Sequence, residues 1–229
     1  MQTAANAQAR GWRSVYFNAP AIPYWLIHVG AIAGVAALGW SWRGLAVAVG
    51  LYAVRLFFVT AGYHRYFAHR SYKTSRWFQF VLALGATATA QKGVLWWAAH
   101  HRRHHRGSDT ADDLHSPYHG GFWWSHMGWI LARDFEGTDH AAIKDFARYP
   151  ELRWLDRYWV VPVLAVAALS YLVGGWFGLT WAFAVSQVLC WHGTFTINSL
   201  SHLWGNRRYA TSDQSRNNPV LALITLGEG

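Results

Sequence analysis

The sequence predicts an all-α integral membrane protein in which four membrane-spanning helices, arranged as two hairpins, carry a helical cap. Three observations predict this class. Hydrophobic residues make up 53% of the 229 residues and aromatic residues 17%, including 16 tryptophans. Mean hydropathy is only +0.04, so the apolar residues must be gathered in blocks. The basic residues flank these blocks, as they do around membrane spans.

Two apolar blocks in the N-terminal quarter are long enough to cross a membrane, for which a helix needs about 20 residues. The first runs from Ile22 to Trp42 and the second from Leu45 to Gly62. The short connection between them predicts a hairpin. Residues 1–9 are polar and small, without a basic stretch before a short apolar core, so we expect no cleaved signal peptide.

A second hairpin is expected between Tyr158 and Asn206, a segment of 49 residues without Asp, Glu, Lys or Arg. The glycine-rich run Gly174–Gly178 divides it into a third and a fourth span joined by a tight turn. Between the two hairpins lies a further apolar run, Phe78–Trp97. A fifth span would place the basic C-terminus on the opposite side, so we expect this run to be one interfacial or cap-buried helix.

The basic residues predict the orientation. Of 20 Lys and Arg residues, 18 lie in the N-terminal tail, between Arg65 and Arg157, or in the C-terminal tail. Under the positive-inside rule, both termini and the central region face the cytoplasm. The net charge of +9 favours anionic lipid or a phosphate-bearing substrate. No nucleic-acid motif accompanies it, so we expect no nucleic-acid partner. The single Cys190 excludes an internal disulfide.

Thirteen histidines include two spaced boxes beside the spans. The second box is H-x2-H-H, and residues three and four apart share a helix face, so its members can point into one site. The first is H-x4-H, and an ideal helix separates its two members by about 140°. Those two bind different metals, or they approach one metal from a locally distorted backbone. The boxes consist of His64 and His69, then His101, His104 and His105.

A further histidine, His202, ends the fourth span, with Asn198 one turn before it and Thr194 one turn further back. Clustered imidazoles repel one another when protonated and lack partners when neutral, and a bound cation removes both problems. Imidazole suits zinc, copper, iron and nickel, and no thiolate cluster accompanies it. At least six histidines exceed the four ligands of a structural zinc site, which indicates two metal ions.

The histidine segments, taken together, resemble a known family. The sequence contains AGYHRYFAHRSYK, WAAHHRRHH, GFWWSHMGW and NSLSHLWG in this order. From about Val54 to Gly229 it is similar to the integral-membrane fatty acyl desaturases, in particular to their stearoyl-CoA (acyl-CoA delta-9) desaturase-like branch. Four helices under a cytosolic cap are also the fold of that family.

The resemblance implies a centre of two iron ions, with dioxygen as co-substrate, held by nine histidines and one asparagine that acts through water. The corresponding ligands here are His64, His69, His101, His104, His105, His202 and, through water, Asn198. Positions that shape the bend of the substrate tunnel correspond to Gln91, Trp97 and Thr194.

Other polar residues of the central region are left outside the metal set. His100 falls beside the pattern of the second box, and His115, His119 and His126 are not assigned as ligands. Asp109 and Asp113 follow the second box and are candidates for orienting ligand imidazoles, since carboxylates commonly accept the second ring N–H of a ligand histidine.

The three remaining ligands of the family belong to a third box that follows Gly-Glu-Gly, and this sequence ends at Gly227-Glu228-Gly229. We therefore expect residues 1–229 to be a single desaturase domain that is incomplete at its C-terminus and inactive alone.

The implied function is oxygen-dependent introduction of a double bond into a long fatty acyl chain, and the basic cap favours acyl-CoA as its carrier. Membrane lipid and a separate electron-donor redox protein are the other expected partners, because the sequence has no haem or iron–sulfur motif. The expected location is the bacterial inner membrane, with the active site on the cytoplasmic side.

Two alternatives stay open. One is a related di-iron membrane hydroxylase that acts on alkanes or acyl chains. The Asn-Ser-x-x-His segment before Gly-Glu-Gly favours the desaturase over it. The other is a non-catalytic metal-binding membrane protein, which would need a polar path through spans that show none.

Overall fold

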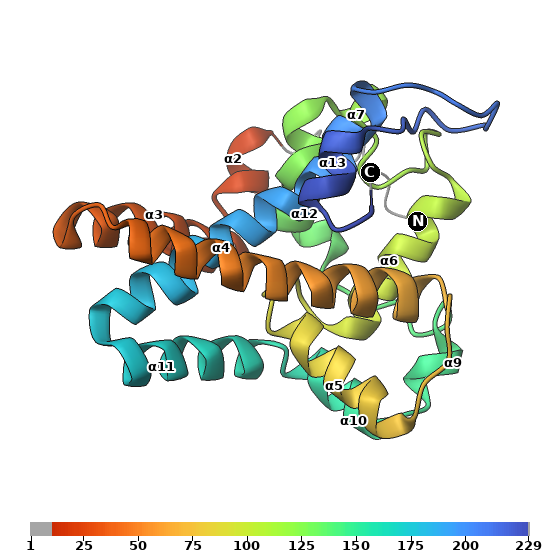
Figure 1. Ribbon diagram of the computed structural model, residues 1–229. Coiled ribbons are helices and arrows are strands. Elements are labelled where there is room, and N and C mark those ends of the chain that lie inside the picture. The colour runs from red at the N-terminus through yellow and green to blue at the C-terminus, as the bar shows by residue number, and fades with distance from the viewer. Residues whose placement is uncertain (1–10, 229) are drawn as a thin grey trace.

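The computed structural model describes residues 11–228, and within them it is built from helices, with one isolated bridge between Asn206 and Asn217. Three helices are long and apolar enough to cross a membrane: Ala19–Leu38, Trp42–Ala68 and Val160–Leu203. The third reverses direction at Gly175, so the spans form two hairpins. Figure 1 shows both hairpins extending to the left, with the shorter helices gathered at the right and top. The predicted all-α membrane fold is confirmed.

The first hairpin joins α3 (Ile22–Leu38) to α4 (Trp42–Phe57), which continues without a break into the π-helix η2 (Phe58–Ala68). The hydroxyl of Ser41 caps α4 by accepting a hydrogen bond from the Gly44 amide. The predicted first span ended too late, because the turn already begins at Gly39 with a φ of 79°. The predicted second span ended six residues too early, because apolar contacts with the cap extend the helix to Ala68.

The second hairpin consists of α11 (Val160–Phe177), the π-helix η5 (Gly178–Val185) and α12 (Ser186–Leu203). Gly175 makes the reversal with φ 56° and ψ −145°, a conformation that a residue with a Cβ rarely adopts. Beyond it, η5 packs along α11. The approach is so close at Gly178 that a Cβ there would lie 2.0 Å from the carbonyl oxygen of Ser170.

The cap is built mainly from α5 (Arg76–Thr87), α6 (Val94–Arg106) and α10 (Pro150–Arg157). The expectation of one helix over Phe78–Trp97 is wrong, since residues 88–93 form a turn between α5 and α6. The carboxylate of Asp156 accepts from the Trp96 amide at 2.8 Å and so caps a new helix at this point. The shorter elements are α2 (Trp12–Tyr16), η1 (Ala19–Ala21), α7 (Pro117–Gly120), η3 (Trp124–Gly128), α8 (Trp129–Leu131), η4 (Arg133–Phe135), α9 (Lys144–Ala147) and α13 (Pro219–Ile224).

A buried arginine fastens the spans to the cap. Arg55 in α4 is 7% exposed and donates to the hydroxyl of Ser186 and to the side-chain oxygen of Gln187, at 3.1 and 2.7 Å. It also donates to the carbonyl of Ala88, in the turn after α5, at 3.0 Å. A charge inside a span is costly unless it is hydrogen-bonded, so these contacts fix α4, α12 and the cap in one arrangement.

Replacing Gly178 tests the close packing of the second hairpin. We expect Gly178→Ala to lower stability by about 1–3 kcal/mol, because the added Cβ overlaps backbone that cannot move aside. Gly174→Ala is the matched control, since a Cβ there meets nothing within 4 Å. Thermal unfolding of the detergent-purified variants measures both, and equal melting temperatures would contradict the packing described here.

Candidate metal centre

The first histidine box lies at the end of η2, where the backbone winds more widely than an α-helix. The amide of His69 donates to the carbonyl of His64, five residues back, at 3.0 Å. This is the hydrogen bond of a π-helix, and it stacks residues five apart on one face. The two Nε2 atoms are consequently 3.0 Å apart. The sequence left two interpretations of this box open: two different metals, or one metal approached from a locally distorted backbone. The structure agrees with the second.

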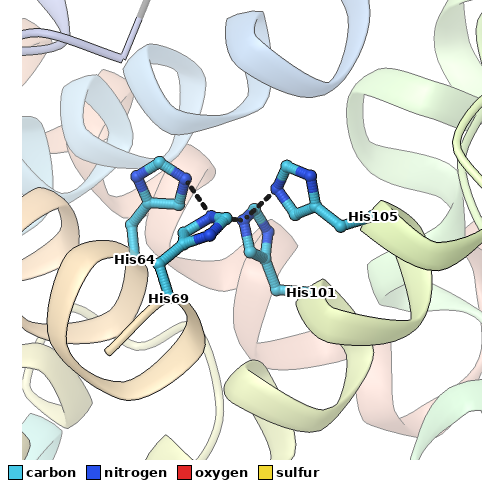
Figure 2. Close-up of side chains that lie close together, drawn as sticks. All are labelled: His64, His69, His101 and His105. Atoms are coloured by element: carbon cyan, nitrogen blue, oxygen red, sulfur yellow. Dashed lines mark hydrogen bonds between the residues drawn. The ribbon is translucent and has the colours of Figure 1, made fainter. Parts of the chain in front are cut away.

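The second box supplies two more rings to the same point. His101 and His105, one turn apart on α6, have Nε2 atoms 2.9 Å apart, and Nε2 of His101 lies 3.2 Å from that of His69. Figure 2 shows the four rings of His64, His69, His101 and His105 turned toward one another from the two helices. Trp97 stacks on His101 at 4.5 Å and fixes the direction of that ring. We call these four residues the four-histidine cluster.

Three rings of this cluster are held neutral. Burial, followed by the neighbouring imidazoles, keeps the pKa of His101 well below its usual range and lowers that of His105 to about 4. Burial and His64 also lower the pKa of His69. Neutral imidazoles offer lone pairs, and four nitrogens at hydrogen-bond separation cannot all be satisfied by one another's hydrogens. The donor set therefore fits a metal ion that prefers nitrogen ligands.

A second group lies beside the first. His104 turns away from the cluster, and its Nδ1 lies 2.8 Å from Oδ1 of Asp113. Nδ1 of His202 lies 2.8 Å from Oδ2 of Asp109, and the rings of His104 and His202 are 5.7 Å apart. A carboxylate that accepts the Nδ1 hydrogen fixes the tautomer and leaves Nε2 free to bind a metal. The second box is thus divided between two neighbouring positions.

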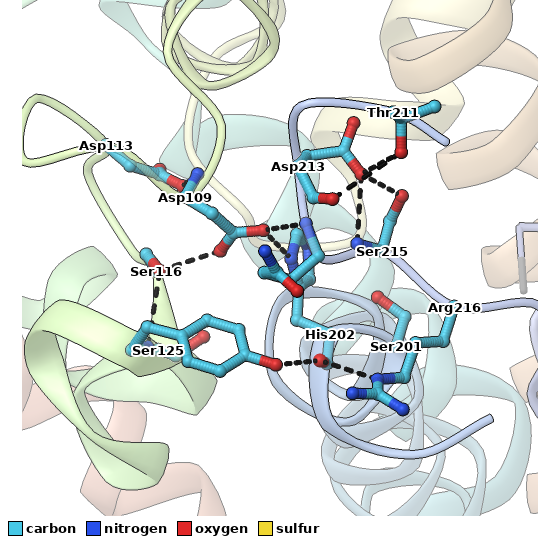
Figure 3. Close-up of polar contacts among 12 residues, drawn as sticks. Asp109, Asp113, Ser116, Ser125, Ser201, His202, Thr211, Asp213, Ser215 and Arg216 are labelled. Carbon is cyan, nitrogen blue, oxygen red and sulfur yellow. Dashed lines mark hydrogen bonds and ion pairs between the residues drawn. The ribbon is translucent and has the colours of Figure 1, made fainter. Parts of the chain in front are cut away.

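Asp109 and Asp113 are anions that organise this second group. Burial alone would raise the pKa of each, but hydrogen bonds from His202 and His104 bring the pKa of both below its usual value. Asp109 also accepts from the hydroxyl of Ser116 and from the amide of Gln214, each at 2.7 Å. Figure 3 shows the carboxylate of Asp109 bonded both to His202 and to the loop that carries Asp213 and Ser215. This loop of the C-terminal region is thereby tied to the site.

One residue of the second group, His115, was left outside the metal set on the sequence alone. His115 is 3% exposed, lies within reach of His104 and Asp113, and has an Nδ1 without a hydrogen-bond partner in the described residues. Its ring stacks on that of His104 at 4.1 Å. A metal lies in the plane of an imidazole that binds it, so the stack supports His104 rather than sharing one ion with it. The spacing of the histidine boxes does not identify such a residue. The only signal in the sequence is the pattern Asp-x-His, in which His115 is the histidine.

The three residues predicted to shape a substrate tunnel lie together. Gln91, Trp97 and Thr194 line a cavity of about 20 Å³ that also borders His101 and Asn198. The amide of Gln91 donates to the hydroxyl of Thr194 at 3.0 Å. The structure thus brings residues from the α5–α6 turn, α6 and α12 to the edge of the four-histidine cluster.

The remaining histidines of the cap lie elsewhere. His100 stacks on Trp96, its Nδ1 is 2.9 Å from the Trp96 carbonyl, and burial lowers its pKa to about 4. Nε2 of His119 contacts the Asp109 carbonyl at 3.0 Å. Burial and His192 lower the pKa of His126 to about 4, and this ring contacts His192 and Ser199.

A larger cavity of about 680 Å³ lies between α3, α11, α12 and the cap. It shares Ile130 and Phe195 with the small cavity, so the two adjoin. Leu26 of α3 and Leu164 of α11 line it and are 64% and 62% exposed. From this high exposure of two lining residues we infer that the cavity opens between α3 and α11. Its cap side carries Lys92, Glu136, Asp156 and Arg157.

The sequence model of the family described as fatty acid desaturase matches residues 38–229, which are most of the chain and include both histidine groups described above. The chain belongs to the fatty acid desaturase family. With its apolar helices, this makes it an integral membrane protein of that family.

Curated relatives agree with the family. The desaturase chain is 34% identical to an sn-1 stearoyl-lipid 9-desaturase of Anabaena variabilis, over 89% of this chain and 75% of that protein. It is 36% identical to an sn-2 palmitoyl-lipid 9-desaturase of Nostoc sp., over 75% and 61%. It is 35% identical to an acyl-CoA C20 Delta5-desaturase of Anemone leveillei, over 82% and 62%. The chain therefore spans about three fifths to three quarters of the length of these relatives.

Metal analysis of variants tests the four-histidine cluster of this desaturase. Replacement of a supporting residue around a metal already lowers affinity about 10–100-fold, so we expect His101→Ala to lose at least that much. His100→Ala, which removes the neighbouring ring outside the cluster, should keep the metal. Elemental analysis of the purified, membrane-inserted protein gives the stoichiometry, and equal metal content in both variants would refute the assignment.

Proposed function

We propose that this chain forms most of an oxygen-dependent fatty acyl desaturase that introduces a double bond into a long acyl chain at a di-iron centre. The observation that carries the proposal is the convergence of four imidazoles beside a second, carboxylate-supported pair. The family and the names of the relatives support an acyl substrate.

Two metal positions are proposed. The four-histidine cluster would hold one iron ion, and His104 and His202 would hold the second, with Asn198 acting through water. Nitrogen ligands without a thiolate suit iron, since the only cysteine, Cys190, is buried in α12 away from both groups. Six histidines also exceed what one closed four-coordinate zinc site uses.

The chemistry divides between the cofactor and the protein. Bound iron, reduced by an external donor, would supply the activation of dioxygen that removes two hydrogens from adjacent methylenes. The protein positions the acyl chain and excludes water. Trp97 and the Gln91–Thr194 hydrogen bond line the small cavity next to His101, so we infer that this cavity receives the methylenes that react.

The large cavity is proposed to hold the rest of the acyl chain. Because it opens between α3 and α11, an acyl chain can enter it from the bilayer while its carrier stays in the membrane. Its cap side has two acidic and two basic residues, which gives no excess of positive charge for the phosphates of coenzyme A. The basic composition of the cap favours acyl-CoA, but the lining of this cavity favours a lipid-linked acyl chain. Relatives of both kinds are known by name.

Electrons are proposed to come from a separate redox protein that docks on the cytoplasmic face. The exposed histidines of the cluster and the arginines around it, such as Arg65 and Arg106, lie on the side that the positive-inside rule assigns to the cytoplasm. We propose the bacterial inner membrane as the location.

Product analysis tests the proposed function. The protein is expressed from its complete coding sequence in a host without endogenous desaturase, with an electron donor, and lipids are analysed by mass spectrometry. We expect acyl chains two hydrogens lighter, lost in His104→Ala and His105→Ala and retained in His100→Ala. An alcohol would identify the hydroxylase instead, and one zinc without any product would identify a non-catalytic metal protein.

Narrowing the opening between α3 and α11 tests the route of entry. We expect Leu26→Trp to lower product from lipid-linked chains at least about tenfold. The larger side chain crowds the opening, and overpacking of this kind costs about 1–3 kcal/mol. Ile32→Trp is the matched control on the same helix, 72% exposed and outside the cavity lining. In a second arm of the experiment, the same two variants receive the acyl chains as acyl-CoA. Equal product from the two variants would rule out lateral entry.

A further inference from the structure

Three histidines outside the metal centre form a separate row that joins the first span, the last span and the cap. His28 of α3 and His192 of α12 face each other, with Nε2 atoms 3.1 Å apart. Nδ1 of His192 lies 2.9 Å from Nε2 of His126, and Nδ1 of His126 lies 3.0 Å from the hydroxyl of Ser199. His28 and His192 belong to neither histidine box.

Backbone carbonyls, which only accept hydrogen bonds, close both ends of this row. Nδ1–H of His28 donates to the carbonyl of Tyr24 at 2.8 Å, and the hydroxyl of Ser199 donates to that of Phe195 at 3.0 Å. The four groups between the carbonyls carry one hydrogen each when neutral, but the row has five contacts. One contact therefore lacks a hydrogen.

The missing hydrogen falls between the two spans. Because the Ser199 hydroxyl is committed to Phe195, His126 must donate through Nδ1 and accept through Nε2. His192 must then donate through Nδ1, which leaves its Nε2 bare. Nε2 of His28 is bare for the same reason, since its Nδ1 carries the hydrogen that bonds Tyr24. Two lone pairs face each other at 3.1 Å.

We propose that His28 and His192 bind one proton between their Nε2 atoms, and that this shared proton fastens the first span to the last. The separation is that of an N–H···N hydrogen bond, and a hydrogen bond with a charged member is about twice as strong as a neutral one. Two rings do not make the four-ligand set of a closed metal site. The titratable groups that face the pair are Tyr24, whose ring lies 4.2 Å from His28, and His126.

The shared proton lies behind the wall of the large cavity. Tyr24 and Trp191 line that cavity with their rings 5.0 Å apart, and His28 stacks on Trp191 at 5.6 Å. The fastening is complete while the proton is bound and is lost as the pH rises. Its loss loosens α3 at the cavity wall and so weakens acyl binding without touching the metal ligands. This consequence rests on the proposed function.

The pH dependence of KM tests the inference. In the wild type, KM for the acyl substrate should rise about tenfold from acid to alkaline pH, with little change in kcat. The side-chain amide of His192→Gln carries two hydrogens, one for the bare Nε2 of His28 and one for the bare Nε2 of His126, so the row is satisfied without the added proton and KM should stay low at every pH. His28→Leu should keep KM high throughout, and His140→Gln, at an exposed cap position, should keep the wild-type profile. Parallel profiles of His192→Gln and the wild type would overturn the proposal.

Infrared spectroscopy of the holoprotein with ring-labelled histidine tests proton binding directly. We expect one more imidazolium per chain in the wild type than in His192→Gln at acid pH. Equal spectra, or the loss of a bound metal in His192→Gln, would overturn the shared proton. This measurement needs no turnover. A wild type that makes no alkene would refute the proposed function, and the spectrum would still show whether the shared proton is bound.

Discussion

The hydrogen bond from the His69 amide to the carbonyl of His64 spans five residues, and the geometry of the metal centre depends on it. An α-helix would direct the two rings to different sides, whereas the wider turn brings both to α6. The end of this turn is held from the second box. Arg102 donates to the carbonyls of Phe67 and Ala68 at 2.7 and 3.0 Å and pairs with Asp145 through both guanidinium NH groups. Arg102, which lies between the histidines of the second box, thus supplies hydrogen bonds to the free carbonyls at the end of η2, the helix that carries the first box.

The division of labour within the second box follows from helix geometry. Seen along α6, His104 lies about 60° to one side of His101 and His105 about 40° to the other. A box with this spacing therefore supplies two neighbouring positions, and local partners decide which ring serves which. His105 meets the rings of η2, while Asp113 draws His104 toward His202. Charge placement, as well as spacing, builds the centre.

The sequence predicted the hairpins because long uncharged runs leave few alternatives to a span. It predicted that His101, His104 and His105 would point into one site, and the structure brings His101 and His105 together but turns His104 toward Asp113. The wide turn at His69 could not be predicted, since the H-x4-H spacing admits more than one backbone. The break before Val94 depends on Asp156, which is distant in the chain and caps α6 only after folding. His115 could be given no role because its place is set by stacking on His104, which no spacing encodes.

The contacts of Asp109 with Gln214 and of His64 with Glu228, whose carboxylate lies 3.2 Å from Nδ1 of the ring, join early and late parts of the chain. During synthesis these partners do not exist at the same time. At about 5–20 residues per second, the ribosome needs roughly 10–30 s to travel from His64 to Glu228. In that interval the second hairpin is still being made, and His64 stands without the carboxylate that later contacts it. The contact between His64 and Glu228 therefore forms only after the second hairpin has been made.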